Sequence, residues 1–213
     1  MKRILFPTLI ILILLPFILL RRSNKTYVKL AGITQGTTYH ITYESKDTVN
    51  LYTEIEDLLS KFDSSLSTYS AGSIISRINN NDTSVIVDNL FKEVFNKALE
   101  INKISGGAFD ITVAPLVNAW GFGNTKRINF DSTVIDTLLQ FVGMEKISLD
   151  GNKIVKENKK IKLDVNAIAQ GYAVDVVAKF IENLGIRNYI PQKFHPTDEI
   201  HPHVPADQFQ GQE

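Results

Sequence analysis

Apolar residues recur at intervals of three and four positions in several long segments of the chain, which is the spacing of one face of an α-helix. In the segment 49–62, for example, Ile55, Leu58, Leu59 and Phe62 fall on one face. Glycines follow several of these segments, as they commonly do where a helix ends. The pattern predicts helices over residues 49–62, 89–105, 133–142 and 167–185, with Asp47 or Thr48 capping the first.

Shorter segments alternate between apolar and polar residues and are rich in β-branched and aromatic side chains, which is typical of strands. Residues 27–43 predict one or two strands with a bend at Gly36. The segment Asp150-Gly151-Asn152 separates two short apolar stretches and predicts a hairpin. The strands of this hairpin and further short strands are predicted at 147–149, 153–155, 85–87, 160–163 and 187–190.

Two other segments have less regular patterns. Residues 66–79 indicate a polar loop that leads into a short amphipathic turn. Residues 112–120 fit either a helix or a strand, although Pro115 argues against a central strand. Because strands and helices are mixed without a regular strand–helix–strand alternation, we predict the α+β class.

The two ends of the chain differ from the part between them. Residues 1–22 contain an apolar run from Ile4 to Leu20 with basic residues on both sides, which predicts a signal peptide or a signal anchor. No small-residue cleavage motif follows the run, so an uncleaved anchor is favoured; a buried core helix is the alternative. Residues 191–213 are rich in proline and histidine and predict a disordered tail, which leaves one domain over 23–190.

Composition narrows the possible functions. The chain has 213 residues, of which 44% are hydrophobic, enough for one domain with a substantial core. Its formal net charge is zero, and nucleic-acid binding usually shows as a basic surplus, so we predict no nucleic-acid partner. The absence of cysteine excludes disulfides within this chain and lipid attachment through a cysteine.

The segment 105–123, SGGAFDITVAPLVNAWGFG, carries the strongest chemical signal. Its paired glycines allow the backbone to turn and to approach a ligand closely. Phe109 offers a flat apolar face and Asp110 offers acceptor oxygens, which suits a planar heterocycle with a polar edge. The alternative is a glycine-rich turn that enters a buried element, with Trp120 and Phe122 in the core.

Four blocks extend this signal along the chain: GTTY at 36–39, LSTYSAGSIISRIN at 66–79, the segment 105–123, and LDVNAIAQGYAVD at 163–175. In this order they resemble the ApbE family, the FAD:protein FMN transferases, from about Leu30 to Tyr189. The resemblance implies a mixed, T-fold-like sheet with packed helices. It also implies a flavin nucleotide site.

The resemblance assigns that site residue by residue. It implies FAD contacts from Tyr69, from Asp164, and from the three consecutive residues Ala108, Phe109 and Asp110. It also implies that the backbone carbonyl of Ala167 ligates Mg²⁺. Gln35 stands where the family usually has methionine, and Gln170 stands where the family usually has lysine or glutamate beside the nucleotide. Structural alternatives exist, with Tyr69 as an exposed loop residue and Asp164 as a helix cap.

The implied reaction moves FMN from FAD to a threonine hydroxyl of a partner protein and releases AMP. It is a phosphoryl transfer, which depends mainly on positioning and on charge neutralisation by the metal. The implied partner is an acceptor flavoprotein subunit of a membrane redox complex. Together with the N-terminal anchor, this predicts a protein attached to the inner (cytoplasmic) membrane that faces the periplasm or another extracytoplasmic space.

After Tyr189 the resemblance ends. The family continues there with a Gly-Gly-Glu turn, a histidine motif and an Asp-x-x-x-Thr segment that supplies the remaining Mg²⁺ ligands, and these are absent from residues 191–213. We therefore expect the C-terminal part of the fold to be missing and the stability to be marginal. A non-catalytic FAD-binding module and an inactive fragment are the alternatives to an active transferase.

Overall fold

The computed structural model describes residues 25–122 and 132–194. The expected anchor at 1–22 and most of the expected tail lie outside the described residues. The elements follow one another as β1 (Tyr27–Thr34), β2 (Thr37–Glu44), α2 (Tyr52–Leu66), α3 (Ile74–Asn79), α4 (Asn89–Ile104), α5 (Ala114–Trp120), α6 (Ser132–Leu139), a 3₁₀ turn (Met144–Lys146), β3 (Ile147–Asp150), β4 (Lys153–Lys156), α7 (Asn166–Asn183) and β5 (Tyr189–Phe194).

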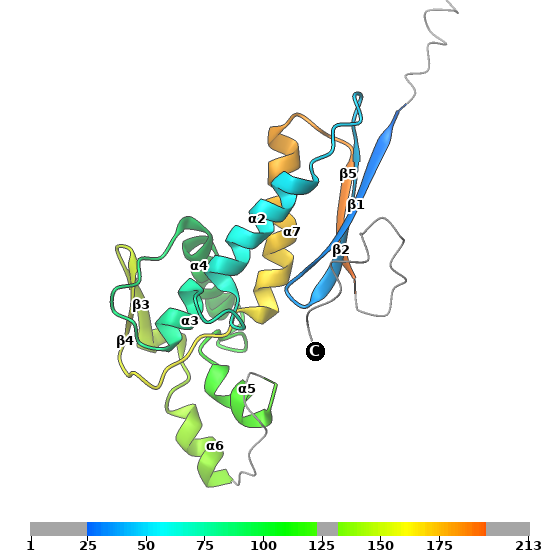
Figure 1. Ribbon diagram of the computed structural model, residues 1–213. Helices are drawn as coiled ribbons and strands as arrows, with labels where there is room; N and C mark the ends of the chain where they lie inside the picture. Colours follow the sequence, from blue (N-terminus) through cyan, green and yellow to red (C-terminus); the bar gives the residue numbers. More distant parts are fainter. Residues whose placement is uncertain (1–24, 123–131, 195–213) are drawn as a thin grey trace, which may run out of the picture.

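A three-stranded antiparallel sheet in the order β1-β2-β5 forms one layer of the molecule (Figure 1). Along β2 the residues Tyr39, Ile41 and Tyr43 are buried and alternate with partly exposed residues, because successive side chains of a strand point to opposite faces. Helices α2 and α7 cover this apolar face (Figure 1). The sheet and its two helices form the frame to which the rest of the chain is attached.

Helices α2, α4 and α7 bury residues at helical spacing. On α7 the buried residues are Ala169, Ala173, Val177 and Ile181, each four positions after the last. The small alanines at the start of this row allow a neighbouring helix to approach closely. Helices α2 and α4 add larger side chains to the core, including Ile55, Leu59, Phe62, Phe91, Val94 and Phe95. Complete burial of each such side chain contributes about 1.5–3 kcal/mol to stability.

The α+β prediction is confirmed, and so are the four long helices, with shifted ends. The predicted cap of the first helix is wrong. Helix α2 starts at Tyr52 with Leu51 as its N-cap residue and no capping side-chain bond. The reason lies in the core: the buried Tyr43 hydroxyl donates to the Val49 carbonyl at 2.6 Å and accepts from the Leu51 N–H at 2.9 Å. These bonds fix the preceding segment, so the helix starts later.

The ambiguous segment 112–120 forms α5, with Pro115 in its first turn, where a missing N–H costs little. The alternative interpretation that placed Trp120 and Phe122 in the core is wrong, since they are 46% and 77% exposed. The segment 85–87 is not a strand: its Val87 N–H donates to the Asn152 carbonyl at 2.9 Å, while Val85 and Val87 are buried. Residues 160–163 contribute a single parallel bridge, Val113 to Lys162.

Strand β5 continues past the expected boundary at Ile190 and reaches Phe194. Pro191 lies opposite Ile41 of β2 in this pairing. A proline is tolerated here because β5 is an edge strand of the described sheet, where one side of the strand needs no ladder bonds. Within the described ranges 25–122 and 132–194, no helix is long and apolar enough to cross a membrane.

Candidate functional site

The segment before α7 leaves Asp164 partly exposed. Leu163 and Val165 are buried on either side of it, because the chain is extended there and successive side chains alternate in direction. Two hydrogen bonds between the side chain of Asn79 and the backbone of Leu163, at 2.7 and 2.9 Å, hold this segment in place. The Asp164 N–H donates to the Ile111 carbonyl at 2.7 Å, so the third and fourth sequence blocks lie side by side.

Asp164 also makes one of the contacts expected of a helix cap, which was the alternative to a ligand contact. Its Oδ1 accepts the N–H of Asn166, the first residue of α7, at 2.8 Å. One carboxylate oxygen therefore satisfies an N–H at the helix start, where backbone donors have no partner within the helix. A carboxylate can accept several bonds, so this contact is compatible with a ligand at the other oxygen.

Tyr69 lies on a loop that serine side chains hold. The Ser73 hydroxyl donates to the Ser67 carbonyl at 2.6 Å and accepts the Ser76 N–H at 3.1 Å as the cap of α3. These bonds close the loop without using Tyr69, whose side chain is 65% exposed. An exposed aromatic ring on a fixed loop is available to stack on a planar ligand.

Two adjacent cavities, which we call together the Tyr69 cleft, meet at Tyr69 and Asn166. The larger one, about 280 Å³, lies between the Tyr69 loop and the segment with Asp164. The smaller one, about 170 Å³, is lined by Gln35 and Gln170 among others. The structure thus brings together four residues that the family resemblance assigned to FAD, from three separate parts of the chain. Their contact with FAD stays a prediction.

Gln35 owes its position to the turn between β1 and β2. Gln35 and Gly36 both have positive φ values, 53° and 71°, as the two-residue turn of a tight hairpin requires. A positive φ is uncommon for a residue other than glycine. The hairpin places Gln35 beside the Asp63 and Phe62 end of α2, at the smaller cavity of the Tyr69 cleft.

Residues 108–110 lie outside the Tyr69 cleft, and Asp110 bonds to other parts of the protein. The two oxygens of Asp110 accept from the Thr112 N–H at 2.7 Å, the Thr112 hydroxyl at 2.5 Å and the Met144 N–H at 3.0 Å. Phe109 is partly buried against the core, and Ala108 is exposed. None of the three lines the cavities of the Tyr69 cleft. Asp110 fastens its loop to the segment at Met144, and the predicted FAD contacts of this group remain predictions.

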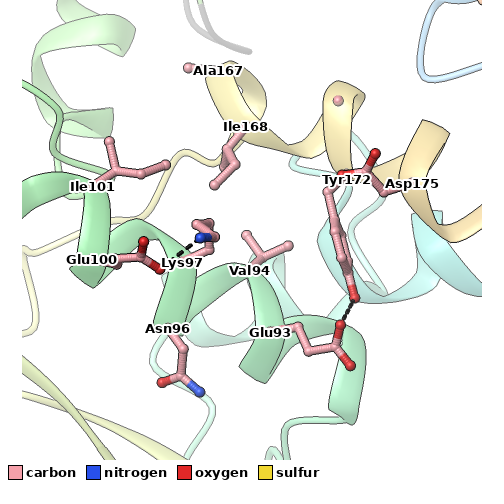
Figure 2. A pocket seen from close by; sticks show the side chains of 11 residues that line it. Glu93, Val94, Asn96, Lys97, Glu100, Ile101, Ala167, Ile168, Tyr172 and Asp175 are labelled. Carbon is pink, nitrogen blue, oxygen red and sulfur yellow. Dashed lines mark hydrogen bonds and ion pairs between the residues drawn. The ribbon is translucent and has the colours of Figure 1, made fainter.

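Ala167 lines a third cavity, a groove of about 720 Å³ between α4 and α7 (Figure 2). Its floor is apolar, and its rim carries Glu93, Glu100 and Asp175. Figure 2 shows Tyr172 pointing at Glu93, to which its hydroxyl donates at 2.5 Å. Burial, and then this carboxylate, raises the pKa of Tyr172 above its ordinary value. Lys97 pairs with Glu100 at 2.7 Å and balances one of these three charges. The net negative charge that remains disfavours a pyrophosphate, so we favour the Tyr69 cleft as the nucleotide site.

Magnesium prefers oxygen ligands and usually takes a few from the protein and the rest from phosphates and water. Within residues 25–122 and 132–194, no group of three or more histidine, cysteine, aspartate or glutamate side chains could hold a metal ion. The role of the Ala167 carbonyl as a Mg²⁺ ligand stays a prediction.

Sequence reasoning missed Lys162, which lines the larger cavity of the Tyr69 cleft beside Asp164. Lys162 is exposed, and its charge contributes to the lowered pKa of Lys156, after the burial of Lys156 itself. A signal for it was present, since Ile161, Leu163 and Val165 are apolar and alternate with Lys162 and Asp164. That alternation puts the ammonium and the carboxylate on the same side of the chain.

Comparison with solved structures identifies the class of the fold as that of the flavin transferases. The flavin transferase ApbE from Vibrio cholerae matches with a TM-score of 0.73 and 34% identity over 79% of this chain and 57% of that chain. The apo form of the flavinyl transferase ApbE from Pseudomonas stutzeri matches with a TM-score of 0.71 and 29% identity, over 79% and 56% of the two chains.

Sequence comparison then gives the family. The ApbE family profile matches residues 35–191, and the chain belongs to the ApbE family. The FAD:protein FMN transferases of Vibrio cholerae and Haemophilus influenzae are each 36% identical to it over 76% of this chain. The matched region covers 51% of either relative, so the chain spans about half the length of these curated relatives.

Proposed function

We propose that this protein is an FAD:protein FMN transferase that uses Mg²⁺, transfers FMN to a threonine of a partner protein and releases AMP. The observation that carries the proposal is the Tyr69 cleft, which gathers Gln35, Tyr69, Asp164 and Gln170 in a chain of the ApbE family. Relatives that are 36% identical are named FAD:protein FMN transferases.

The residues of the cleft suit the parts of FAD. The exposed ring of Tyr69 offers a stacking surface for one of the two planar ring systems. Asp164 offers acceptor oxygens for N–H or hydroxyl groups of the nucleotide. Lys162 supplies a positive charge, and the start of α7 supplies the positive end of a helix dipole. These last two groups favour the pyrophosphate.

In the proposed reaction the threonine oxygen forms a bond to the phosphorus of the FMN half of FAD. The bond from that phosphorus to the bridging oxygen breaks, and AMP leaves with the bridging oxygen. The proton of the threonine hydroxyl passes to solvent water as the phosphoester forms. The task of the protein is to align the two oxygens with the phosphorus, and bound Mg²⁺ would neutralise charge on the phosphates.

A non-catalytic FAD-binding module is the second candidate. It is favoured by one observation: the described residues offer no cluster of three side chains that could hold a metal. Such a module would bind FAD in the Tyr69 cleft without cleaving it. Both candidates predict FAD binding, but only the transferase predicts an acceptor protein that carries FMN.

The test incubates the full chain with FAD, Mg²⁺ and an acceptor protein that carries the target threonine. After a denaturing gel, a transferase gives a fluorescent acceptor band, and an acceptor with alanine in place of the threonine gives none. A full-length relative serves as the positive control. FAD binding measured by fluorescence titration together with a dark gel would establish the binding module and refute the transferase.

For the cell, we propose that residues 1–22 anchor the protein in the cytoplasmic membrane, with the folded part on the extracytoplasmic side. The support is the apolar run between basic residues in the sequence. The proposed acceptor is a flavoprotein subunit of a membrane redox complex. Fractionation of cells that express the full chain would place it in the membrane pellet, resistant to alkaline carbonate. Release by carbonate would contradict the anchor.

A further inference from the structure

Three exposed apolar side chains gather at the end of the molecule where the described chain begins. Tyr27 comes from the start of β1, Val49 from the loop between β2 and α2, and Leu184 from the loop between α7 and β5. They are 48%, 53% and 51% exposed. All three segments lie at the upper end of the molecule in Figure 1. We call these three residues the terminal patch.

Backbone hydrogen bonds hold the three segments together. The Ser45 N–H donates to the Thr26 carbonyl at 2.9 Å, and the Glu44 N–H donates to the Asn188 carbonyl at 2.8 Å. Val49 and Leu184 line the same cavity of about 460 Å³. The Tyr43 hydroxyl also holds Val49 in place, because it donates to the Val49 carbonyl at 2.6 Å. The apolar side chains are therefore presented to solvent by a bonded framework.

Basic side chains outnumber acidic ones around the terminal patch. Lys25, Lys46 and Arg187 are exposed and belong to the same three segments, which also carry Glu44 and the exposed Asp47. Glu44, the acid at the centre, is bound by Lys25 at 3.2 Å and by the Asn188 side chain, which lower the pKa of its carboxyl group. The apolar run from Ile4 to Leu20 ends in Arg21 and Arg22, only a few residues before β1. A short connection keeps the start of β1 near any membrane that holds this run.

We propose that the terminal patch rests on the surface of an anionic phospholipid bilayer, which makes it the membrane-facing end of the domain. Aromatic and aliphatic side chains enter the interface between headgroups and acyl chains, and lysine and arginine bind the phosphates around them. The proposal rests on the proposed membrane attachment. It does not depend on flavin transfer.

This arrangement also determines how far the candidate flavin site lies from the bilayer surface. Helix α7 has 18 residues, with Asn166 at the Tyr69 cleft and Leu184 directly after its other end. At about 1.5 Å per residue its ends lie about 27 Å apart. Three contact points at one end hold the domain upright, so the cleft stands about 27 Å above the bilayer. An acceptor threonine must reach that height.

The experiment uses single-cysteine labels, since the chain has no cysteine of its own. Val49→Cys and Leu184→Cys each carry one environment-sensitive fluorophore. Ile104→Cys is the matched control, because Ile104 is 77% exposed and ends α4 beside the start of α7. Each labelled full chain is reconstituted into vesicles of phosphatidylcholine and phosphatidylglycerol, with and without lipids that carry a nitroxide near the headgroup.

We expect the nitroxide to quench the labels at residues 49 and 184 several-fold more than the label at 104, and less so when phosphatidylglycerol is left out. Equal quenching at all three positions, or none at 49 and 184, overturns the proposal. A blue-shifted label that the nitroxide does not quench shows that protein covers the patch, and also overturns it. Because no readout involves FAD, failure here leaves the transferase proposal intact, and a dark flavin gel leaves this one intact.

Discussion

Two regions that the sequence assigned to the same ligand are built in opposite ways. In the Tyr69 cleft, Tyr69 is largely exposed, and the loop that carries it is closed by serines. In the 108–110 loop, both carboxylate oxygens of Asp110 accept bonds from the protein itself. One region keeps its chemical groups available to a ligand, and the other uses its most polar group to hold its own shape.

The difference shows how to distinguish residues that bind the ligand from residues that stabilise the fold, when the same family resemblance assigns both to one site. A side chain whose bonds are all internal acts first through stability. An exposed side chain on a loop that is fixed by other residues acts first through the ligand. Substitutions at Asp110 should therefore move the unfolding free energy, and substitutions at Tyr69 and Asp164 should move FAD affinity.

The largest effect is expected for Asp110→Ala. It removes the acceptor of three hydrogen bonds and leaves the Met144 N–H without its partner, so it should lower the free energy of unfolding by about 3 kcal/mol. Asp57→Ala, an exposed aspartate on α2, is the control and should change it by less than about 0.5 kcal/mol. Urea denaturation of both variants measures the difference. Equal stability would place Asp110 with the cleft residues.

Tyr69→Ala should weaken FAD binding about tenfold, because loss of stacking on one ring costs about 1–3 kcal/mol. Its midpoint of thermal unfolding should stay that of the unchanged chain, since the side chain is 65% exposed. Tyr69→Phe keeps the ring and should keep the affinity. Tyr27→Ala, an exposed tyrosine at the opposite end, is the control for a general effect. A fluorescence titration that finds equal affinity for Tyr69→Ala would remove this residue from the site.

Asp164→Asn should weaken FAD binding by several-fold, about 1 kcal/mol, through loss of one charged acceptor. The asparagine Oδ1 can still accept the Asn166 N–H, so stability should change little. Titration with FAD and urea denaturation of the same sample separate the two effects. Unchanged affinity together with lower stability would show that Asp164 serves as a helix cap and not as a nucleotide ligand.

The smallest effect concerns Asp82, which is partly exposed like Asp164 and accepts several internal hydrogen bonds like Asp110. The Ser84 hydroxyl and N–H, and then the Arg77 guanidinium, lower the pKa of its carboxyl group to about 2. A lowered pKa favours the folded state above the ordinary pKa near 4, and this contribution is lost as the pH falls from about 4 to about 2. In Asp82→Asn the melting temperature should fall less steeply across that window. An identical slope would refute the assignment.

The sequence predicted much of this fold because the periods of its apolar positions are local. The rows of α2, α4 and α7 and the alternation of residues 27–43 identified the main elements. Helix α2 starts late because Tyr43, from another element, bonds to the segment before it. Trp120 and Phe122 are 46% and 77% exposed, which composition cannot reveal because exposure depends on contacts with distant segments.

By itself the sequence determined the family, the α+β class and the residue types of a flavin site, since motifs and periodicity are properties of neighbouring positions. Only the tertiary structure decided which of those residues share one cleft. Gln35, Tyr69, Asp164 and Gln170 meet there because a hairpin turn, a serine-bonded loop and the start of α7 converge. It also decided that Asp110 holds its loop and that Lys162 stands beside Asp164, because hydrogen-bond partners and charge neighbours depend on contacts between distant segments.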